Sequence, residues 1–308
     1  MENWDVVIVG GGASGMSAAL ILAQARRTVL VLDGGSPRNR FDDHQHGYLT
    51  RDGMDPAELV AIGREEAERY GAVVRPVEVT GVSGEAGDFH LSLKDAEPIA
   101  CQRLLIATGI RDELPDIEGI EQLWGDAVFD CPYCHGCEIG DKVVGVLAVG
   151  EESIAEAHLL LQWANHVVLL LNDAVEPSPG QLKALDERGI RCVAGKVVAC
   201  EIAGDELASV RLADGSHVVL DQLLIATETT PNRDLLDELG VTVLEKPDKD
   251  GMWVPTDDSG LTDVPGVWVA RNVRDGNAQV IDAAAQGLKS AIAINADLTA
   301  DLVRRLES

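Results

Sequence analysis

The segment Cys131-Pro132-Tyr133-Cys134-His135 has the residue types and the spacing of a redox-active disulfide. Two cysteines separated by two residues can close into a small disulfide. Such a motif commonly lowers the pKa of one thiol, so that a thiolate is available at neutral pH. The pair can therefore accept and release two electrons. Pro132 removes a backbone donor between the cysteines, which favours a more oxidising disulfide.

Two metal-centred interpretations compete with the redox pair. A structural zinc site needs four ligands and usually a second closely spaced Cys or His pair, which this sequence lacks, although the nearby Cys137 keeps a metal site open. The pattern Cys-x-x-Cys-His is also that of c-type haem attachment. That chemistry requires export, and the N-terminus has neither a basic segment nor a cleavable apolar one. We expect no metal.

The N-terminus carries a second chemical signal, the turn Gly10-x-Gly12-x-x-Gly15. An apolar strand over 5–9 precedes it, and a helix from 16 to about 24 follows. Glycines at this spacing let the backbone approach a pyrophosphate at the helix N-terminus. A second strand, 28–32, ends in Asp33, whose carboxylate can accept from ribose hydroxyls. Strand, helix and acid together predict a dinucleotide site.

The next part of the chain continues as mixed helix and strand. We expect a helix over 56–70, β segments over 73–82 and 89–94, and a strand over 103–107. From Asp112 the composition changes to a Pro- and Glu-bearing connection, which indicates a domain boundary.

A second βαβ unit then begins with a strand over 142–149, a helix to about 163 and a strand over 166–171, and it closes at 222–226. Pro231-Asn232 marks a return crossing. This domain therefore starts like a second nucleotide domain.

A strand over 266–270 and an Ala-rich helix over 278–298 would rejoin the first domain. The predicted fold class is α/β, with two Rossmann-like three-layer nucleotide-binding domains, the second inserted into the first. The expected boundaries are 1–112 with 232–308 for the first domain and 113–231 for the second.

Composition excludes several partners. The 308 residues carry a formal charge of −27, which disfavours nucleic acid and anionic membranes by repulsion. No apolar run is long enough to span a bilayer, so we expect a protein without a membrane partner. Six cysteines are too few and too scattered for a secreted disulfide scaffold, which predicts a cytoplasmic protein. Three of them have apolar, strand-like neighbours and are expected to be buried without a redox role: Cys101, Cys192 and Cys200.

Over nearly its whole length the sequence resembles the low-molecular-weight thioredoxin reductases. The resemblance rests on the glycine turn, on Ala107-Thr108-Gly109, on Cys131-x-x-Cys134 and on Gly266-Val267-Trp268, in that order. It implies FAD in the interrupted domain, NADPH in the inserted domain and a homodimer. The cofactor-binding residues that it implies here are Gly10, Gly12, Ala13, Ser14, Gly15, Asp33, Gly34, Arg38, Asn39, His46, Val79, Ala107, Thr108, Gly109, Asn272, Val273, Gln279 and Val280. His44 and His46 are interpreted as flavin or substrate contacts rather than as a metal pair.

Departures from the family pattern make NADP(H) doubtful. The second glycine turn of the family is replaced by Gly150-Glu151-Glu152, whose carboxylates oppose a phosphate at the helix N-terminus. Asn172-Asp173 stands where arginines would hold the 2′-phosphate of NADPH. Arg271 occupies a position where glycine is expected beside the flavin.

The sequence Cys-Pro-Tyr-Cys-His-Gly resembles the branch that contains the dithiol oxidases of gliotoxin and holomycin biosynthesis. This resemblance implies that Cys134 faces the flavin and that Cys131 exchanges with substrate. His135 would be the general base, although a packing or capping role stays open. We predict an FAD-dependent oxidase of a small-molecule dithiol with oxygen as acceptor. The alternatives are an NAD(P)H-dependent disulfide reductase and a non-catalytic flavin-binding module.

Overall fold

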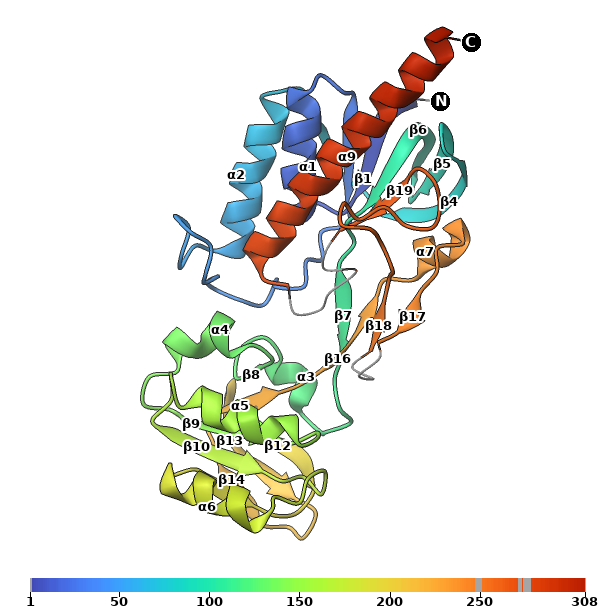
Figure 1. Ribbon diagram of the computed structural model, residues 1–308. Coiled ribbons are helices and arrows are strands. Elements are labelled where there is room, and N and C mark those ends of the chain that lie inside the picture. Colours follow the sequence, from blue (N-terminus) through green and yellow to red (C-terminus); the bar gives the residue numbers. More distant parts are fainter. Residues whose placement is uncertain (1, 247–250, 271–272, 274–277, 308) are drawn as a thin grey trace. The chain divides into compact units, whose positions relative to one another are not determined.

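The structure is a computed structural model that describes residues 2–246, 251–270, 273 and 278–307 (Figure 1). The chain divides into two compact units. Unit 1 comprises Met1–Asp112 and Thr229–Ser308, and unit 2 comprises Glu113–Glu228. The first division falls within strand β7 (Ile110–Glu113) and the second within β16 (Glu228–Pro231), where the sequence had suggested 231/232.

Unit 1 is built on a mixed sheet. Its neighbours β3, β2, β1, β6 and β19 are parallel, whereas β4 and β5 continue from β6 as an antiparallel meander. The amino-terminal part of β6 pairs with β5, and its last residues pair with β19. The strands span β1 (Glu2–Val9), β2 (Val29–Asp33), β3 (Val73–Pro76), β4 (Val79–Glu85), β5 (Asp88–Leu93), β6 (Ala96–Ile106) and β19 (Val267–Val269).

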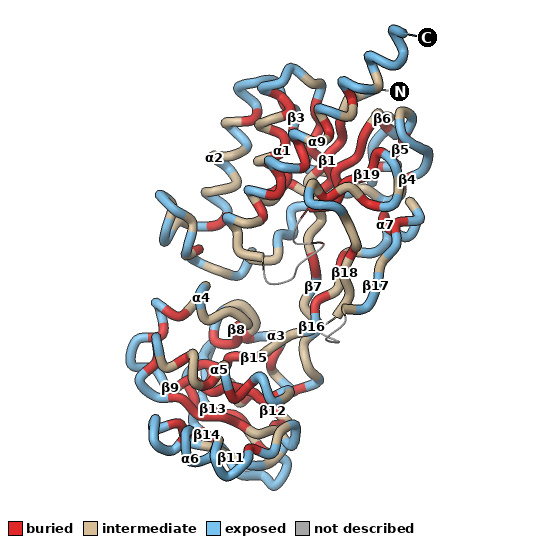
Figure 2. The backbone as a smooth tube through the Cα atoms, in the orientation of Figure 1, coloured by how far each residue is buried: buried red, intermediate tan, exposed pale blue. Residues whose placement is uncertain are grey.

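Three helices cover one face of this sheet (Figure 1): α1 (Ala13–Gln24), α2 (Pro56–Glu68) and α9 (Val280–Glu307). Strand β1 shows why two layers can pack on it. Val6 and Ile8 belong to the apolar cluster shared with α1 and α9, while Val7 and Val9 belong to the cluster on the opposite face. That second cluster includes residues of the meander and of α7 (Asp234–Leu239). Because successive strand residues alternate between faces, a continuous apolar strand is buried on both (Figure 2).

Unit 2 repeats the layering around a parallel five-stranded sheet in the order β11-β10-β9-β15-β8. Helices α5 (Glu152–Leu160) and α6 (Pro179–Glu187) contribute to the cluster on one face, and the antiparallel strands β12, β13 and β14 to the cluster on the other. Strand bounds are β8 (Val128–Phe129), β9 (Val143–Leu147), β10 (His166–Leu170), β11 (Arg191–Val193), β12 (Val197–Ala203), β13 (Glu206–Leu212), β14 (His217–Val219) and β15 (Gln222–Ile225). The remaining elements are α3 (Ile120–Leu123), α4 (Pro132–His135), η1 (Gly136–Glu138), β17 (Leu244–Glu245) and β18 (Met252–Trp253).

The predicted α/β class and its Rossmann-like parallel sheets are confirmed, and several element bounds differ from the prediction; β6, for example, begins at Ala96 and not at 103. Residues 73–82 form two strands instead of one, because Pro76 lacks the N–H that would continue a ladder. The last helix continues to Glu307 rather than ending at 298. Its final turns expose Leu302 and Leu306, so they lack the apolar pattern that the prediction followed. Buried Arg103 on β6 stabilises them through ion pairs, with Nε 2.5 Å from Asp297 Oδ2 and Nη2 3.3 Å from Asp301 Oδ2.

The α1–α9 packing depends on Gly287, where a Cβ would overlap the carbonyl of Ser14. We expect Gly287→Ala to lower the free energy of unfolding by about 1–3 kcal/mol, because backbone must shift to admit the methyl group. Chemical denaturation measures this. The control is Gly180→Ala in α6, where the added carbon meets only Ser178 Oγ at 4.0 Å, and which should change stability by less than about 0.5 kcal/mol. Equal effects of the two substitutions would refute the close contact.

Candidate active site

The first glycine turn brings β1, β6 and α1 together in unit 1. Gly10 has a φ of +110°, and a Cβ there would overlap the carbonyl of Ala107 at the end of β6. A Cβ on Gly15 would overlap the carbonyl of Gly10. Glycine is therefore required at both positions for the helix to begin this close to the strand ends.

The N-terminus of α1 has room and unused donors. Gly12 is the N-cap, and a Cβ built there meets no described atom within 4 Å. Two buried hydroxyls beside this turn lack a hydrogen-bond partner among the described residues, Ser14 Oγ and Thr108 Oγ1. Amides at a helix start and orphaned hydroxyls fit the pyrophosphate of a dinucleotide such as FAD. Ala13 begins the helix, and Gly109 follows Thr108 with a φ of +70°.

Asp33, the predicted ribose contact, is the last residue of β2 and lies beside the glycine turn. Its carboxyl group is next to Gly11, since a Cβ on Gly11 would touch it, and its Oδ1 accepts from the Gly35 amide at 3.0 Å. Gly34 has open space beside it among the described atoms. One carboxylate oxygen therefore remains for a hydroxyl at the end of β2.

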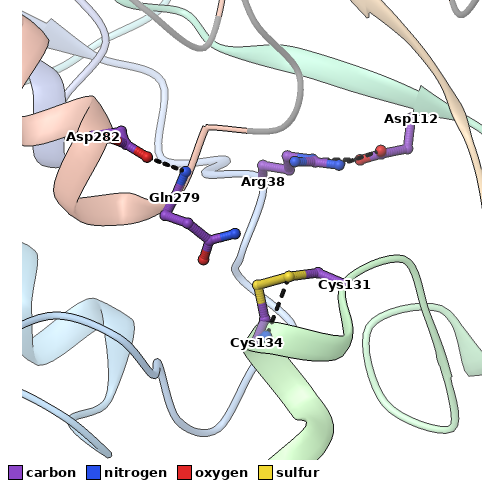
Figure 3. The surroundings of a disulfide bond; sticks show 6 residues. All are labelled: Arg38, Asp112, Cys131, Cys134, Gln279 and Asp282. Carbon is purple, nitrogen blue, oxygen red and sulfur yellow. Dashed lines mark hydrogen bonds and ion pairs between the residues drawn. A yellow bond between two sulfur atoms is a disulfide. The ribbon is translucent and has the colours of Figure 1, made fainter. Parts of the chain in front are cut away.

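Arg38 and Asn39 follow on the same loop. The Arg38 guanidinium makes a two-point ion pair with Asp112, whose side chain is buried, with Nε to Oδ2 at 2.7 Å and Nη2 to Oδ1 at 2.5 Å (Figure 3). The carbonyl of Asn39 accepts from the Asp42 amide. Arg38 thus positions this loop against the end of β7, and its donors toward a cofactor are correspondingly fewer.

His46 belongs to a hairpin-like loop closed by pairing of Gln45 with Met54. Its Nδ1 lies 3.5 Å from Asp52 Oδ1. The Gly47 amide, which donates to Asp52 at 2.9 Å, is the main cause that holds the pKa of this carboxyl below its usual value. Gln45 is buried, and neither Nε2 nor Oε1 of its side chain has a hydrogen-bond partner among the described residues. The sequence analysis did not single out Gln45, and only its neighbour His46 pointed to this loop.

The remaining predicted flavin contacts are at strand and helix ends. Val79 begins β4, and Val273 is buried with its amide donating to Ala270 at 3.0 Å. The Gln279 amide donates to Asp282 at 3.2 Å just before Val280 begins α9 (Figure 3). Asn272 and Arg271 lie outside the described residues.

Asn232 contacts the loop after β6. The sequence analysis had identified it only as part of the point where the chain returns to the first domain. Its Nδ2 donates to the carbonyl of Thr108 at 2.7 Å, while its Oδ1 is buried without a partner in the described part of the chain. The second crossing is therefore bonded directly to the loop after β6, beside the orphaned hydroxyl of Thr108.

The cysteine pair lies at the start of α4 in unit 2. Cys131 and Cys134 form a disulfide with a Cα–Cα separation of 5.3 Å (Figure 3). Cys131 is the extended N-cap, and its Sγ accepts from the Cys134 amide at 3.2 Å. After reduction the same donor would stabilise a Cys131 thiolate. Pro132 occupies the first helical position, where its missing N–H costs no helical hydrogen bond.

Aromatic rings fix this short helix. A Cβ on Gly136 would overlap the ring of Trp163, so α4 rests directly on that indole. Exposed Tyr133 meets Trp163 edge to face at 5.0 Å. The His135 ring packs 5.1 Å from buried Phe129. Trp163 was not predicted as a site residue. The one signal for it was a glycine directly after Cys-x-x-Cys-His.

The second glycine turn differs from the first. The Glu152 carboxylate lies so close to Gly150 that a Cβ on that glycine would overlap it. Ser153 Oγ accepts from the Val149 amide at 3.2 Å. A carboxylate therefore lies at the start of α5, where its negative charge opposes a phosphate.

The residue two positions after β10, Asn172, also uses its side chain for hydrogen bonds within unit 2. Asn172, at a φ of +50°, donates to the Ala148 carbonyl (3.2 Å) and accepts from the Val197 amide (3.0 Å). Its side chain therefore holds the strand ends together. The next residue, Asp173, also has a positive φ and is exposed.

No cluster of three or more His, Cys, Asp or Glu side chains that could hold a metal occurs among the described residues. His44 instead lines a surface pocket with acidic neighbours, among them Asp52, Asp55 and Glu58. Likewise, none of the described helices is both long and apolar enough to cross a bilayer.

Comparison with known proteins identifies the family. Residues 4–287 match the family described as pyridine nucleotide-disulphide oxidoreductase. The chain belongs to this family. The predicted resemblance to thioredoxin reductase-like flavoproteins is confirmed by similar proteins and structures.

Curated relatives of this disulphide oxidoreductase are named thioredoxin reductases. One, sirT of Leptosphaeria maculans, is 28% identical over 98% of this chain and 97% of the relative. Another, tcpT of Claviceps purpurea, is 30% identical over 77% of each chain. Among solved structures, HlmI is 38% identical with a TM-score of 0.88, covering 99% of this chain and 96% of that one. An oxidoreductase from Agrobacterium tumefaciens is 35% identical with a TM-score of 0.88, covering 97% and 99%.

The thiols should differ sharply in reactivity. Burial raises the pKa of Cys101 to about 12 and that of Cys200 to about 11. At pH 8 both groups are therefore protonated and unreactive, and they gain thiolate only as pH approaches those values. In the native oxidised protein we expect N-ethylmaleimide to modify exposed Cys137 within minutes and to leave Cys101 and Cys200 intact until unfolding. Peptide mapping reads this out, and rapid native modification of Cys101 would contradict the structure.

Proposed function

We propose that the chain is an FAD-dependent dithiol oxidase, which closes a disulfide in a small molecule and uses oxygen as the final electron acceptor. The observation that carries the proposal is the Glu152 carboxylate beside Gly150, because a negative charge at this helix start opposes the phosphates of a nicotinamide cofactor. Electrons would then have to come from the thiol side. An intact Cys131–Cys134 disulfide is the oxidised form that such a substrate requires.

The cysteine step is a thiol–disulfide exchange. A substrate thiolate attacks Cys131 Sγ, a mixed disulfide forms, and Cys134 leaves as a thiolate. The second substrate thiol then attacks the substrate sulfur of that link and releases Cys131. The Cys134 amide, which already donates to Cys131 Sγ, stabilises the charge on this leaving group. The substrate loses two electrons and two protons, and the cysteine pair gains the electrons.

Unit 1 supports FAD as the resident cofactor. The open helix start beside Gly12, the orphaned hydroxyls of Ser14 and Thr108, and the free oxygen of Asp33 suit a pyrophosphate and a ribose. FAD, when bound there, would take the electron pair from the reduced cysteines and pass it to oxygen.

His135 is proposed as the proton acceptor for the substrate thiol. It directly follows Cys134 on α4, and Phe129 orients its ring. An imidazole can take a proton from a thiol and return it near neutral pH.

The second candidate is an NAD(P)H-dependent disulfide reductase. Exposed Asp173 after β10 favours it, since an acid there suits the free ribose of NADH. The homodimer and the cytoplasmic location implied by the resemblance and the cysteine content remain predictions. The charge of −27 argues against a nucleic-acid partner.

Aerobic turnover tests the proposed reaction. With a small aliphatic dithiol we expect one oxygen consumed and one peroxide formed per disulfide, at a rate that NADPH and NADH leave unchanged. Cys134→Ser should lower turnover by about 10³-fold or more, because no disulfide can form at the start of α4. Cys192→Ser, which alters a thiol in strand β11, is the matched control and should retain full turnover. A rate that requires a nicotinamide would overturn the oxidase.

Nicotinamide binding tests the role of Glu152. We expect no saturable binding of NADPH or NADH to the protein by calorimetry, and a measurable affinity to appear in Glu152→Ala as the turn is vacated. Glu187→Ala removes the same charge from the end of α6 and should leave binding absent. Tight binding by the unaltered protein would contradict the proposal.

The base and packing roles of His135 can be separated by two substitutions. His135→Phe keeps a ring against Phe129 but cannot accept a proton, whereas His135→Gln loses the ring. We expect both to lower turnover by about 10²-fold or more at pH 7, and the loss in each to shrink as pH rises toward the substrate thiol pKa. If His135→Phe retained normal turnover at pH 7, the histidine would be a packing residue.

A further inference from the structure

The cysteine motif continues one step beyond the disulfide. Cys134-His135-Gly136-Cys137 repeats the spacing of Cys131-Pro132-Tyr133-Cys134, so that Cys134 belongs to two overlapping Cys-x-x-Cys pairs. The dithiol chemistry described above uses only the first pair. Cys137 is exposed and lies outside the disulfide.

Backbone geometry places Cys137 beside Cys134. Helix α4 passes directly into η1, with Gly136 at φ −57° and ψ −38° and its amide donating to the Pro132 carbonyl. The Ile139 amide donates to Gly136 at 3.2 Å, so the helical turn continues through Cys137. Residues three apart on a helix share a face, and their Cα atoms are about 5 Å apart. That separation is close to the 5.3 Å of Cys131 and Cys134, and disulfides form at such distances.

We propose that Cys137 is a third redox-active thiol, which exchanges with Cys131 as the disulfide partner of Cys134. The Cys137 thiol loses its proton, and its thiolate attacks Cys134 Sγ. A Cys134–Cys137 bond forms as the Cys131–Cys134 bond breaks, and Cys131 leaves as a thiolate that takes up the proton. No electrons enter or leave, so the step needs no cofactor, oxidant or substrate.

The two disulfides are not equivalent. Cys131 has an extended backbone at the N-cap, and the Cys134 amide donates to its sulfur, so a Cys131 thiolate is a stabilised leaving group. Cys131 is half-buried whereas Cys137 is exposed. Exchange therefore places one sulfur of the disulfide at a solvent-exposed position, where a larger thiol can attack it.

The inference is independent of the proposed oxidase activity, because the exchange occurs within the oxidised chain. The direct test uses Cys131→Ser, reduced and then treated anaerobically with one equivalent of 2-hydroxyethyl disulfide. We expect both thiols, Cys134 and Cys137, to be lost, two molecules of mercaptoethanol to be released, and mass spectrometry to show a Cys134–Cys137 cross-link. The control Cys131→Ser/Cys137→Ser should keep mercaptoethanol bound to Cys134. A stable mercaptoethanol adduct on the single variant would overturn the proposal.

The unaltered protein supplies a second arm that does not depend on the folding of a variant. The oxidised protein is denatured at neutral pH in a large excess of N-ethylmaleimide, so that each free thiol is blocked at once, and fragmentation locates the label within 131–137. We expect a fraction of chains to carry the label on Cys131 with Cys134 and Cys137 cross-linked, and this fraction to vanish in Cys137→Ser. Label confined to Cys137 would overturn the exchange, whatever the variant shows.

Discussion

Both units depend on how closely a helix start can approach the end of its central strand. In unit 1, Gly10 and Gly15 permit that approach, and the space beside Gly12 stays open. In unit 2 the equivalent space at Gly150 contains the Glu152 carboxylate. The helix N-terminus favours an anion in both places. One unit leaves that position to a ligand, and the other supplies the anion from its own chain. This asymmetry is the basis of the proposal that unit 1, and not unit 2, holds a dinucleotide.

The position of the cysteine pair is set both by neighbouring residues and by a residue distant in the sequence of unit 2. The N-cap position of Cys131, the proline after it and the amide of Cys134 are set by four consecutive residues. The helix that carries them rests on Trp163, whose ring lies against Gly136. Trp163 thus supports the short helix that carries the disulfide.

The sequence was most informative where chemistry depends on neighbours in the chain. The glycine turn, Asp33 and the cysteine pair were all predicted, because their spacing directly encodes a turn or a disulfide. Glu152 was predicted to oppose a phosphate, but its contact with Gly150 required coordinates. Trp163, Gln45 and Asn232 were missed, since contacts between distant segments leave no periodic pattern. The end of α9 was missed because its last turns are stabilised by ion pairs with buried Arg103, which lies on strand β6.

The central claim is that electrons enter from a dithiol and not from a nicotinamide. The most direct measurement is an anaerobic titration of the purified yellow protein, in which flavin absorbance is followed during additions of a small dithiol, NADPH and NADH in separate samples. The account predicts bleaching by one equivalent of dithiol, no rapid bleaching by either nicotinamide, and return of colour with peroxide when air is admitted. Rapid bleaching by NADPH or NADH, with the dithiol inert, would contradict it.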